Sequence, residues 1–212
     1  MTNSAVDILK KLGAIITDDH FVYTSGKHGS VYINKDALYP HTEETSQIGK
    51  MFAEKYKDMD IDVVAAPALG GIILSQWTAY HLSKLKGKEV LGVYTEKTPE
   101  KNQIFTRGYD KLVKGKNVLV IEDLTTTGGS VRKVVDSVKA VGGNVVAVCV
   151  MVNRDPKLVT SVIVDAPFSS LGILVADATD KKDCPLCKKN VPINTSVGHG
   201  RKYLEAKKNT SK

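Results

Sequence analysis

The sequence has few of the residues that would place it outside the ordinary globular class. It has three cysteines and one tryptophan in 212 residues, and aromatic side chains make up 6%. Three cysteines are too few for a secreted disulfide framework, and an odd number fits a reducing cytosol. The hydrophobic content of 42% and the charged content of 25% exclude a disordered or fibrous chain. We therefore expect a cytoplasmic protein of one domain with at most a small appendage.

The chain also lacks a segment that is best explained as a transmembrane helix. Residues 63–83 contain no Asp, Glu, Lys or Arg and are long enough to span a bilayer. They nevertheless include Pro67, Gly70 and Gly71 and begin with a strand-like VVAA run, so a buried strand, a glycine turn and a core helix explain them better. The N-terminal residues carry early acids and no apolar core of signal-peptide length. We expect no membrane partner.

Most of the chain carries no net charge. The net charge is +7, but residues 181–212 alone hold nine Lys and Arg against two acids, and residues 1–180 carry 21 of each sign. A neutral body excludes a basic face over the whole domain, and we do not expect a nucleic-acid partner. The prediction is a single domain over residues 1–180, with a small N-terminal hood over about residues 1–40. A basic tail of low structure follows over residues 181–212.

After residue 60, uniformly apolar segments alternate with helix-like ones. Apolar, β-branched runs of this kind are typical of parallel strands buried on both faces. The pattern therefore predicts an α/β fold, a doubly wound, mostly parallel sheet flanked by helices. Strands are predicted over 61–66, 89–94, 117–123, 144–152 and 161–165, with helices over about 71–84 and 130–141. Before this core we expect a short helix over 4–12, two short strands near Ile15 and Phe21, and a helix over about 43–56.

The strongest local signal is VLVIEDLTTTGGS, residues 118–130. An apolar strand ends in Glu122 and Asp123, a hydroxyl- and glycine-rich turn follows, and a valine-striped helix comes next. In open α/β sheets, ligands bind at the carboxyl ends of strands, where glycines let several N–H groups face one anion. The pattern predicts a phosphate site without the lysine of a P-loop. The alternative is a purely structural role, in which the acids end a strand and the turn caps the next helix.

These residues resemble the signature of the type I phosphoribosyltransferases. That family transfers the ribosyl group of phosphoribosyl pyrophosphate in the presence of Mg²⁺. The resemblance implies that Glu122 and Asp123 contact the ribose hydroxyls and that Mg²⁺ is held mainly through substrate and water near them, without direct protein ligands. The residues it assigns to phosphoribosyl pyrophosphate are Glu122, Asp123, Leu124, Thr125, Thr126, Thr127, Gly128, Gly129 and Ser130.

Three further segments are similar to those of the orotate phosphoribosyltransferase family. FVYTSGKHGSVYIN (21–34) resembles the segment that lies over the pyrimidine, and AAPALGGIILSQ (65–76) resembles the pyrophosphate loop. NRDP (153–156) puts Arg154 where that family has an arginine facing the base, and CPLCKKNVPINTSVGHG (184–200) resembles a tail of some members. The resemblance adds Ala68, Leu69, Gly70 and Gly71 to the phosphoribosyl pyrophosphate site. It assigns orotate to Thr126, Arg154, Tyr32 and Lys27.

The resemblance also implies a mobile loop that closes over the site, and here the chain departs from the family pattern. Many members have RKxxKxHG, whereas this chain has YTEKTPEKNQIFTRGY (94–109), which contains no histidine. Lys97, Lys101 and Arg107 are the candidate catalytic cations, acting beside the catalytic acids Glu122 and Asp123. Many members also have a lysine where Thr24 stands. A transferase acting on a purine or another base therefore stays open as an alternative.

Each assignment has a structural alternative. Lys97 and Lys101 sit among polar residues typical of a solvated loop, Arg154 could pair with Asp155 or Asp165 at the surface, and Tyr32 could be strand core. A non-enzymatic regulator that senses phosphoribosyl pyrophosphate is a second functional alternative. The resemblance implies a homodimer with shared active sites.

Cys184 and Cys187 have the spacing of a zinc knuckle, but a four-ligand site needs two more partners. The sequence suggests only His199 and the distant Cys149, and Cys149 lies in a predicted buried strand. These considerations favour a structural turn or a redox-sensitive pair over zinc.

Overall fold

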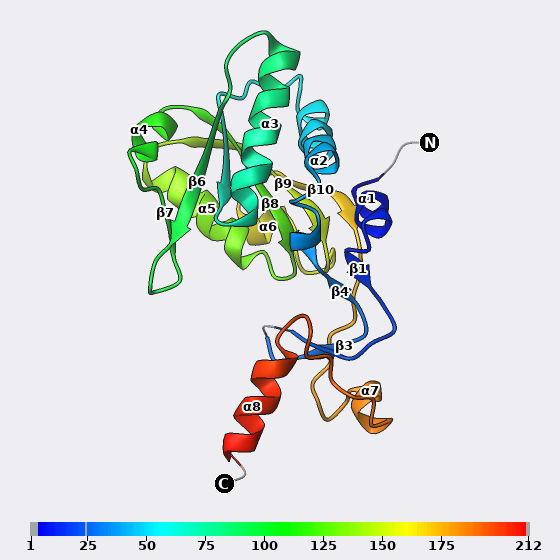
Figure 1. Cartoon of the computed structure of the whole chain (residues 1–212). Coiled ribbons are helices and arrows are strands. Elements are labelled where there is room, and N and C mark those ends of the chain that lie inside the picture. Colours follow the sequence, from blue (N-terminus) through cyan, green and yellow to red (C-terminus); the bar gives the residue numbers. More distant parts are fainter. Residues whose placement is uncertain (1–3, 24, 211–212) are drawn as a thin grey trace.

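The computed structural model describes residues 4–23 and 25–210. Its centre is a six-stranded sheet in the order β10-β9-β8-β5-β6-β7, parallel except for β7 at one edge. Helices cover both faces (Figure 1), so the predicted doubly wound α/β fold is confirmed. The sheet and its helices comprise β5 (Val63–Pro67), α3 (Gly70–Lys86), β6 (Leu91–Lys97), β7 (Gln103–Ile104), α4 (Tyr109–Val113), β8 (Asn117–Thr125), α5 (Gly129–Ala140), β9 (Asn144–Asn153), α6 (Ser161–Val164) and β10 (Phe168–Ile173).

Successive strand residues point to opposite faces of the sheet and form two cores. In β5, Val64 and Ala66 pack with α1, α2 and α3, whereas Val63 and Ala65 pack with α4, α5 and α6. The valine stripe of α5 is fully buried on the second side. Residues 63–83 form β5, a turn and most of α3, as predicted. No helix of the described chain combines the length and apolar character needed to cross a membrane.

The N-terminal residues form small elements at the edge of this core. Helix α1 (Ala5–Lys11) is capped by Ser4, which accepts from the N–H of Asp7, and α2 (Thr42–Lys55) packs beside α3. Both predicted short strands are present, but β1 pairs with β4 and β2 pairs with β3. The hood elements are β1 (Ile15–Ile16), β2 (Phe21–Val22), β3 (His28–Gly29), β4 (Tyr32–Ile33) and the 3-10 helix η1 (Lys35–Ala37).

The strand predicted over 161–165 is wrong, because these residues form the one-turn helix α6. Thr160 precedes the helix and Asp165 ends it in the left-handed conformation with φ +57°. Val164 is buried against the α5 side of the sheet, while Val162 is 85% exposed. A short apolar run has no period that separates strand from helix. The strand beside β9 is β10, which the sequence pattern did not reveal.

The prediction of a tail of low structure is also wrong within the described residues. The tail forms α7 (Pro185–Lys188) and α8 (Gly200–Thr210) and lies against the hood (Figure 1). The N–H groups of Asn194 and His199 donate to the carbonyls of His20 and Val22 at 2.8 and 3.0 Å. The tail is held by hydrogen bonds and side-chain contacts with the hood. Because such contacts need no apolar stripe on the tail, its sequence shows no apolar period that would have predicted them.

Candidate active site

Strand β8 places Glu122 and Asp123 near the carboxyl end of the sheet, where β8 passes into the turn before α5. Both carboxylates are buried, at 7% and 2% exposure. The strand is central, between β5 and β9, and its other side chains anchor it in both cores. The acid pair is therefore fixed by the sheet rather than by a flexible loop.

Asp123 has two partners that the sequence patterns did not identify. Its Oδ2 accepts hydrogen bonds from Lys35 Nζ at 2.6 Å and from Tyr39 OH at 2.7 Å, and its Oδ1 accepts from the N–H of Leu124. Burial tends to lower the pKa of Lys35, but the charge and hydrogen bond of Asp123 raise it above its ordinary value. Burial, with the Asp123 charge, raises the pKa of Tyr39. Lys35 and Tyr39 belong to a KDALYP stretch in which no motif was identified, so only the fold reveals them.

Glu122 is the member of the acid pair whose ionisation is disfavoured. Its burial, and next the adjacent Asp123 charge, raise its pKa well above the ordinary value, against the smaller opposing effect of Lys35. Its Oε1 accepts from the N–H of Asp123 at 3.0 Å. A pair that resists full ionisation gains stability when a cation or hydroxyl donor approaches.

The turn after β8 has the geometry expected of a phosphate cradle. Gly128 has φ +77°, a conformation that favours glycine, and its N–H donates to Thr125 Oγ1 at 3.0 Å. The turn residues Thr126, Thr127, Gly129 and Ser130 are exposed at the N-terminus of α5. The first N–H groups of a helix have no partner within that helix and favour an anion. Leu124 differs, because its side chain packs against the core.

The loop between β5 and α3 meets the acid pair. A side-chain carbon on Gly70 would collide with Tyr39 OH and Asp123 Oδ2, so this close approach requires glycine. The N–H of Ala68 bonds the carbonyl of Thr95, and Gly71 packs on Ala66. The predicted pyrophosphate loop and the predicted ribose site therefore adjoin. Leu69 is 82% exposed.

Arg154 lies beside the same turn, because its N–H donates to the carbonyl of Thr125 at 2.9 Å. Its guanidinium carbon is 4.7 Å from the centroid of the Tyr23 ring, which orders the fork by a cation–π contact. Among the described residues, Arg154 forms no ion pair with Asp155 or Asp165. Asp165 pairs with Arg132 and Lys139 instead. The surface-bridge alternative for Arg154 is therefore wrong.

Besides Arg154 and the turn residue Thr126, the two remaining predicted orotate residues lie in the hood. Tyr32 is partly buried, and its ring packs on Phe21 with the centroids 5.4 Å apart. Lys27 is exposed in the turn between β2 and β3. Thr24 lies outside the described residues.

The three predicted loop cations lie on the arm that runs from the end of β6 through β7 to the start of α4 (Figure 1). Arg107 donates from Nε to Glu96 Oε1 at 3.0 Å, and both side chains are substantially exposed. Across residues 4–23 and 25–210, none of Lys97, Lys101 and Arg107 forms a hydrogen bond or ion pair with the acid pair. The single chain thus brings together the acid pair, the turn, the glycine loop and Arg154, but not the arm cations.

The comparisons with known proteins agree with this geometry. A family model described as the phosphoribosyl transferase domain matches residues 34–164. The orotate phosphoribosyltransferase of a Thermoanaerobacter species is 37% identical over 188 residues, which cover 89% of this chain and 93% of the relative. That of Thermotoga maritima is 34% identical over 197 residues, which cover 92% of this chain and 98% of the relative.

Solved structures share the fold. The orotate phosphoribosyltransferase of Mycobacterium tuberculosis aligns with a TM-score of 0.63 and 23% identity, over 80% of this chain and 96% of that one. An adenine phosphoribosyltransferase from Thermoanaerobacter pseudethanolicus aligns with a TM-score of 0.59 and 19% identity, over 78% and 99%. Because enzymes for different bases share this architecture, the fold alone does not select the base. The sequence relatives do, and the chain belongs to the orotate phosphoribosyltransferase family of the phosphoribosyltransferases.

Proposed function

We propose that the chain transfers the 5-phosphoribosyl group of phosphoribosyl pyrophosphate to a ring nitrogen of orotate, giving orotidine 5′-monophosphate and pyrophosphate. The observation that carries this proposal is the buried acid pair beside a phosphate turn and a glycine loop, in a chain 33–37% identical to orotate phosphoribosyltransferases over about 90% of its length. The step belongs to pyrimidine biosynthesis, and a cytoplasmic location suits it.

In the reaction, the bond between the ribose carbon and the pyrophosphate oxygen breaks as the carbon–nitrogen bond to orotate forms. Positive charge develops on the sugar and negative charge on the leaving group. Glu122 and Asp123 would hold the ribose hydroxyls and favour the positive sugar, while the turn from Thr125 to Ser130 would hold the 5′-phosphate still. Lys35 and Tyr39 would act as positioning residues, because they orient Asp123.

The glycine loop and Arg154 would serve the two other parts of the substrates. The backbone at 68–71 lies against the acid pair, where the pyrophosphate would adjoin the ribose. The Arg154 fork, lying over Tyr23, suits the planar orotate and its carboxylate, which a guanidinium can bind through two hydrogen bonds. Thr126, Tyr32 and Lys27 are the further candidates for contact with orotate.

Phosphoribosyltransferases in general use Mg²⁺ with phosphoribosyl pyrophosphate, and the residues here fit a magnesium ion held through water and substrate. Both oxygens of Asp123 already accept hydrogen bonds from the protein, which disfavours direct ligation. Mg²⁺ prefers oxygen ligands and keeps several waters, so Glu122 and Asp123 would hold its hydration shell. The bound ion would neutralise charge on the pyrophosphate.

We further propose a homodimer in which the arm of one subunit completes the site of the other, since the arm cations stand apart from the acid pair of their own chain. One face of α3 supports an interface: Leu69, Ile73 and Tyr80 follow one another at helical spacing and are 82%, 38% and 51% exposed. Light scattering should give a dimer for the native chain and a monomer for the double variant Ile73→Glu/Tyr80→Glu. A monomeric native chain with full activity would refute the shared site.

The function is tested by pyrophosphate release with Mg²⁺ and phosphoribosyl pyrophosphate, offering orotate, uracil, adenine, hypoxanthine and xanthine in turn. Release with orotate alone is expected. Release confined to a purine would replace orotate by that base. Absence of release with all five would favour a regulator that senses phosphoribosyl pyrophosphate.

A further inference from the structure

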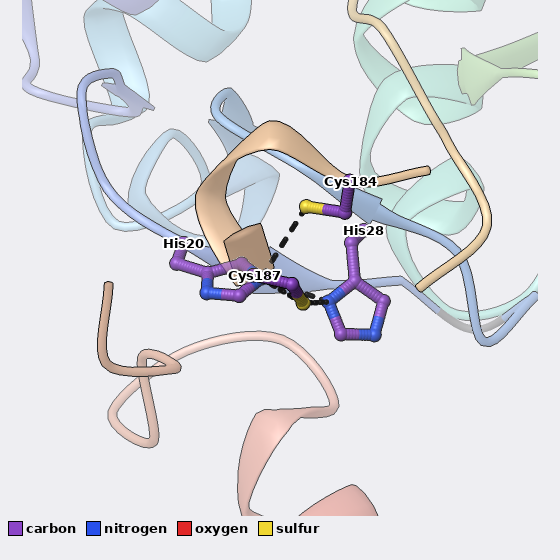
Figure 2. A group of neighbouring side chains, drawn as sticks. All are labelled: His20, His28, Cys184 and Cys187. Carbon is purple, nitrogen blue, oxygen red and sulfur yellow. Dashed lines mark hydrogen bonds between the residues drawn. The ribbon is translucent and has the colours of Figure 1, made fainter. Parts of the chain in front are cut away.

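Four metal-ligating side chains meet where the tail crosses the hood. His20 precedes β2, His28 begins β3, and Cys184 and Cys187 flank the start of α7 (Figure 2). His20 and Cys184 are 164 positions apart in the chain, yet one ligand atom from each of the four residues lies within 4.8 Å of all the others. The inventory of possible zinc partners drawn from the sequence was therefore wrong, because it contained neither histidine.

The distances are close to those of a tetrahedral zinc site. With Zn–S bonds of about 2.3 Å and Zn–N bonds of about 2.0 Å, tetrahedral geometry puts nitrogen and sulfur ligands roughly 3.5 Å apart. Cys187 Sγ lies 3.4 Å from His28 Nδ1 and 3.7 Å from His20 Nε2, and Cys184 Sγ lies 3.8 Å from His20 Nε2. The two ring nitrogens, 2.8 Å apart, would separate by about half an ångström around a metal.

The surroundings prepare these atoms as ligands. His20 Nδ1 lies 2.8 Å from the carbonyl of Val191, and donation of its proton there leaves the Nε2 lone pair facing the cluster. His28 is fixed by two backbone hydrogen bonds with Thr179 and by the ring of Tyr203, which packs edge-on at 5.2 Å. His20 thus has the hydrogen-bonded second partner that sets the tautomer of a metal-bound histidine, and the His28 ring is held in place by its neighbours.

Burial makes the cluster hard to explain without a metal. His20, His28 and Cys184 are 1%, 0% and 1% exposed, and this part of the chain contributes little to the two apolar cores. A redox-active cysteine pair would need neither imidazole, and a structural turn would need neither thiol. Two thiolates and two neutral imidazoles, in contrast, balance the charge of one divalent ion.

We propose that His20, His28, Cys184 and Cys187 bind one Zn²⁺ ion in a tetrahedral Cys₂His₂ site that joins the tail to the hood. Binding releases the two thiol protons to solvent and involves no oxidation or reduction. A site with four protein ligands has no open position for substrate, so its role is structural. The ligands His20 and His28 flank the segment that contains Tyr23 and Lys27, and Tyr23 lies under Arg154. The metal would therefore hold the segment that faces the proposed base end of the active site.

The first measurement is the metal content of the full-length chain purified under reducing conditions. Elemental analysis by inductively coupled plasma mass spectrometry should find one zinc per chain. After removal of the metal with a chelator, one equivalent of Co²⁺ should give the intense visible bands of tetrahedral cobalt and near-ultraviolet thiolate-to-cobalt charge transfer. Neither readout depends on activity, so the metal site and the proposed transferase reaction fail or succeed separately.

Variants then assign the ligands. The double variant Cys184→Ser/Cys187→Ser should lose the stoichiometric zinc and the charge-transfer band, and His28→Gln should weaken cobalt binding by at least about tenfold. The matched controls are Cys149→Ala, in β9, and His41→Gln, exposed before α2, and both should retain one zinc. A native chain without zinc that gives no tetrahedral cobalt spectrum would overturn the proposal. Retention of one zinc by the double cysteine variant would overturn it as well.

Discussion

The acid pair and the His/Cys cluster are both buried groups of titratable side chains, but they are stabilised in different ways. Glu122 and Asp123 lie on the central strand β8, between apolar cores on both faces of the sheet. The cluster lies outside the sheet, where the hood consists of two-residue strands and the tail is short of apolar contacts. The central sheet therefore holds the acid pair in place, whereas the proposed metal would cross-link the hood to the tail.

This difference bears on how the two regions respond to change. The body of the domain can tolerate a poorly ionised acid pair, because β8 remains anchored by its apolar neighbours. Loss of the proposed metal would leave the hood and the tail joined by backbone hydrogen bonds and a few side-chain contacts. Effects on turnover should therefore concentrate at β8, and effects on local order should concentrate at the cluster.

The largest expected effect is that of Asp123→Asn. The amide keeps the shape of the side chain but removes the charge that faces the sugar and Lys35, and kcat should fall by about a hundredfold or more. The thermal midpoint should change by only a few degrees, because the strand stays in place. The matched control is Asp136→Asn, an exposed acid on α5 that pairs with Arg132. Unchanged kcat in pyrophosphate release would remove Asp123 from its assigned role.

Removal of the metal should affect order more than turnover. Amide exchange should accelerate by at least about tenfold in residues 20–29 and 184–200, while β8 and β9 keep their protection. The KM for orotate should rise more than the KM for phosphoribosyl pyrophosphate. Hydrogen exchange of the native chain and the double cysteine variant measures this directly. Equal acceleration in hood, tail and sheet would mean that the two regions form one cooperative unit.

The sequence predicted one of these regions far better than the other, for a physical reason. Residues 118–130 contain strand, acids, turn and helix in one continuous stretch, so the local pattern was sufficient to predict the order strand, acid pair, turn and helix that the structure has. The apolar runs likewise predicted β5, β6, β8 and β9 with errors of a few residues at their ends. The roles of all the predicted site residues, including Lys97, Lys101 and Arg107, stay predictions.

Contacts between distant segments left no such signal. Lys35 and Tyr39 reach Asp123 only because the chain returns to the sheet after the hood, and His20 and His28 reach Cys184 only because the tail returns to the hood. The prediction of a strand at α6 is wrong because a run of three apolar residues has no distinctive period. Histidines at positions 20 and 28 were a usable clue, since a zinc knuckle with two cysteines needs two further ligands from elsewhere in the chain.

Arg154→Lys tests whether the base end of the site depends on the planar fork. Lysine keeps the charge but cannot form two parallel hydrogen bonds or the same contact with Tyr23, so the KM for orotate should rise by about tenfold, equivalent to about 1.4 kcal/mol. The KM for phosphoribosyl pyrophosphate should be unchanged. Lys157→Met, an exposed neighbour, is the control. An equal rise in both constants would indicate that Arg154 supports the turn rather than the base.

The smallest expected effect concerns the free-energy cost of ionising the buried Glu122 carboxyl. Because its folded pKa lies above the ordinary 4.5, the folded chain holds this proton more tightly than the unfolded chain. The stabilisation is complete below about pH 4.5 and is lost as the pH rises through the folded pKa. Glu122→Gln cannot ionise, so its thermal midpoint should exceed that of the native chain by roughly 2–4 °C at high pH for each kcal/mol removed.

The advantage of Glu122→Gln should shrink toward pH 4.5, where the native carboxyl is protonated in the folded chain. Thermal unfolding of both proteins across this range measures it, with Glu54→Gln, an exposed acid at the end of α2, as the control. A midpoint difference that is independent of pH would mean that the substitution acts through packing. It would also mean that the sheet supports a fully ionised acid pair without cost.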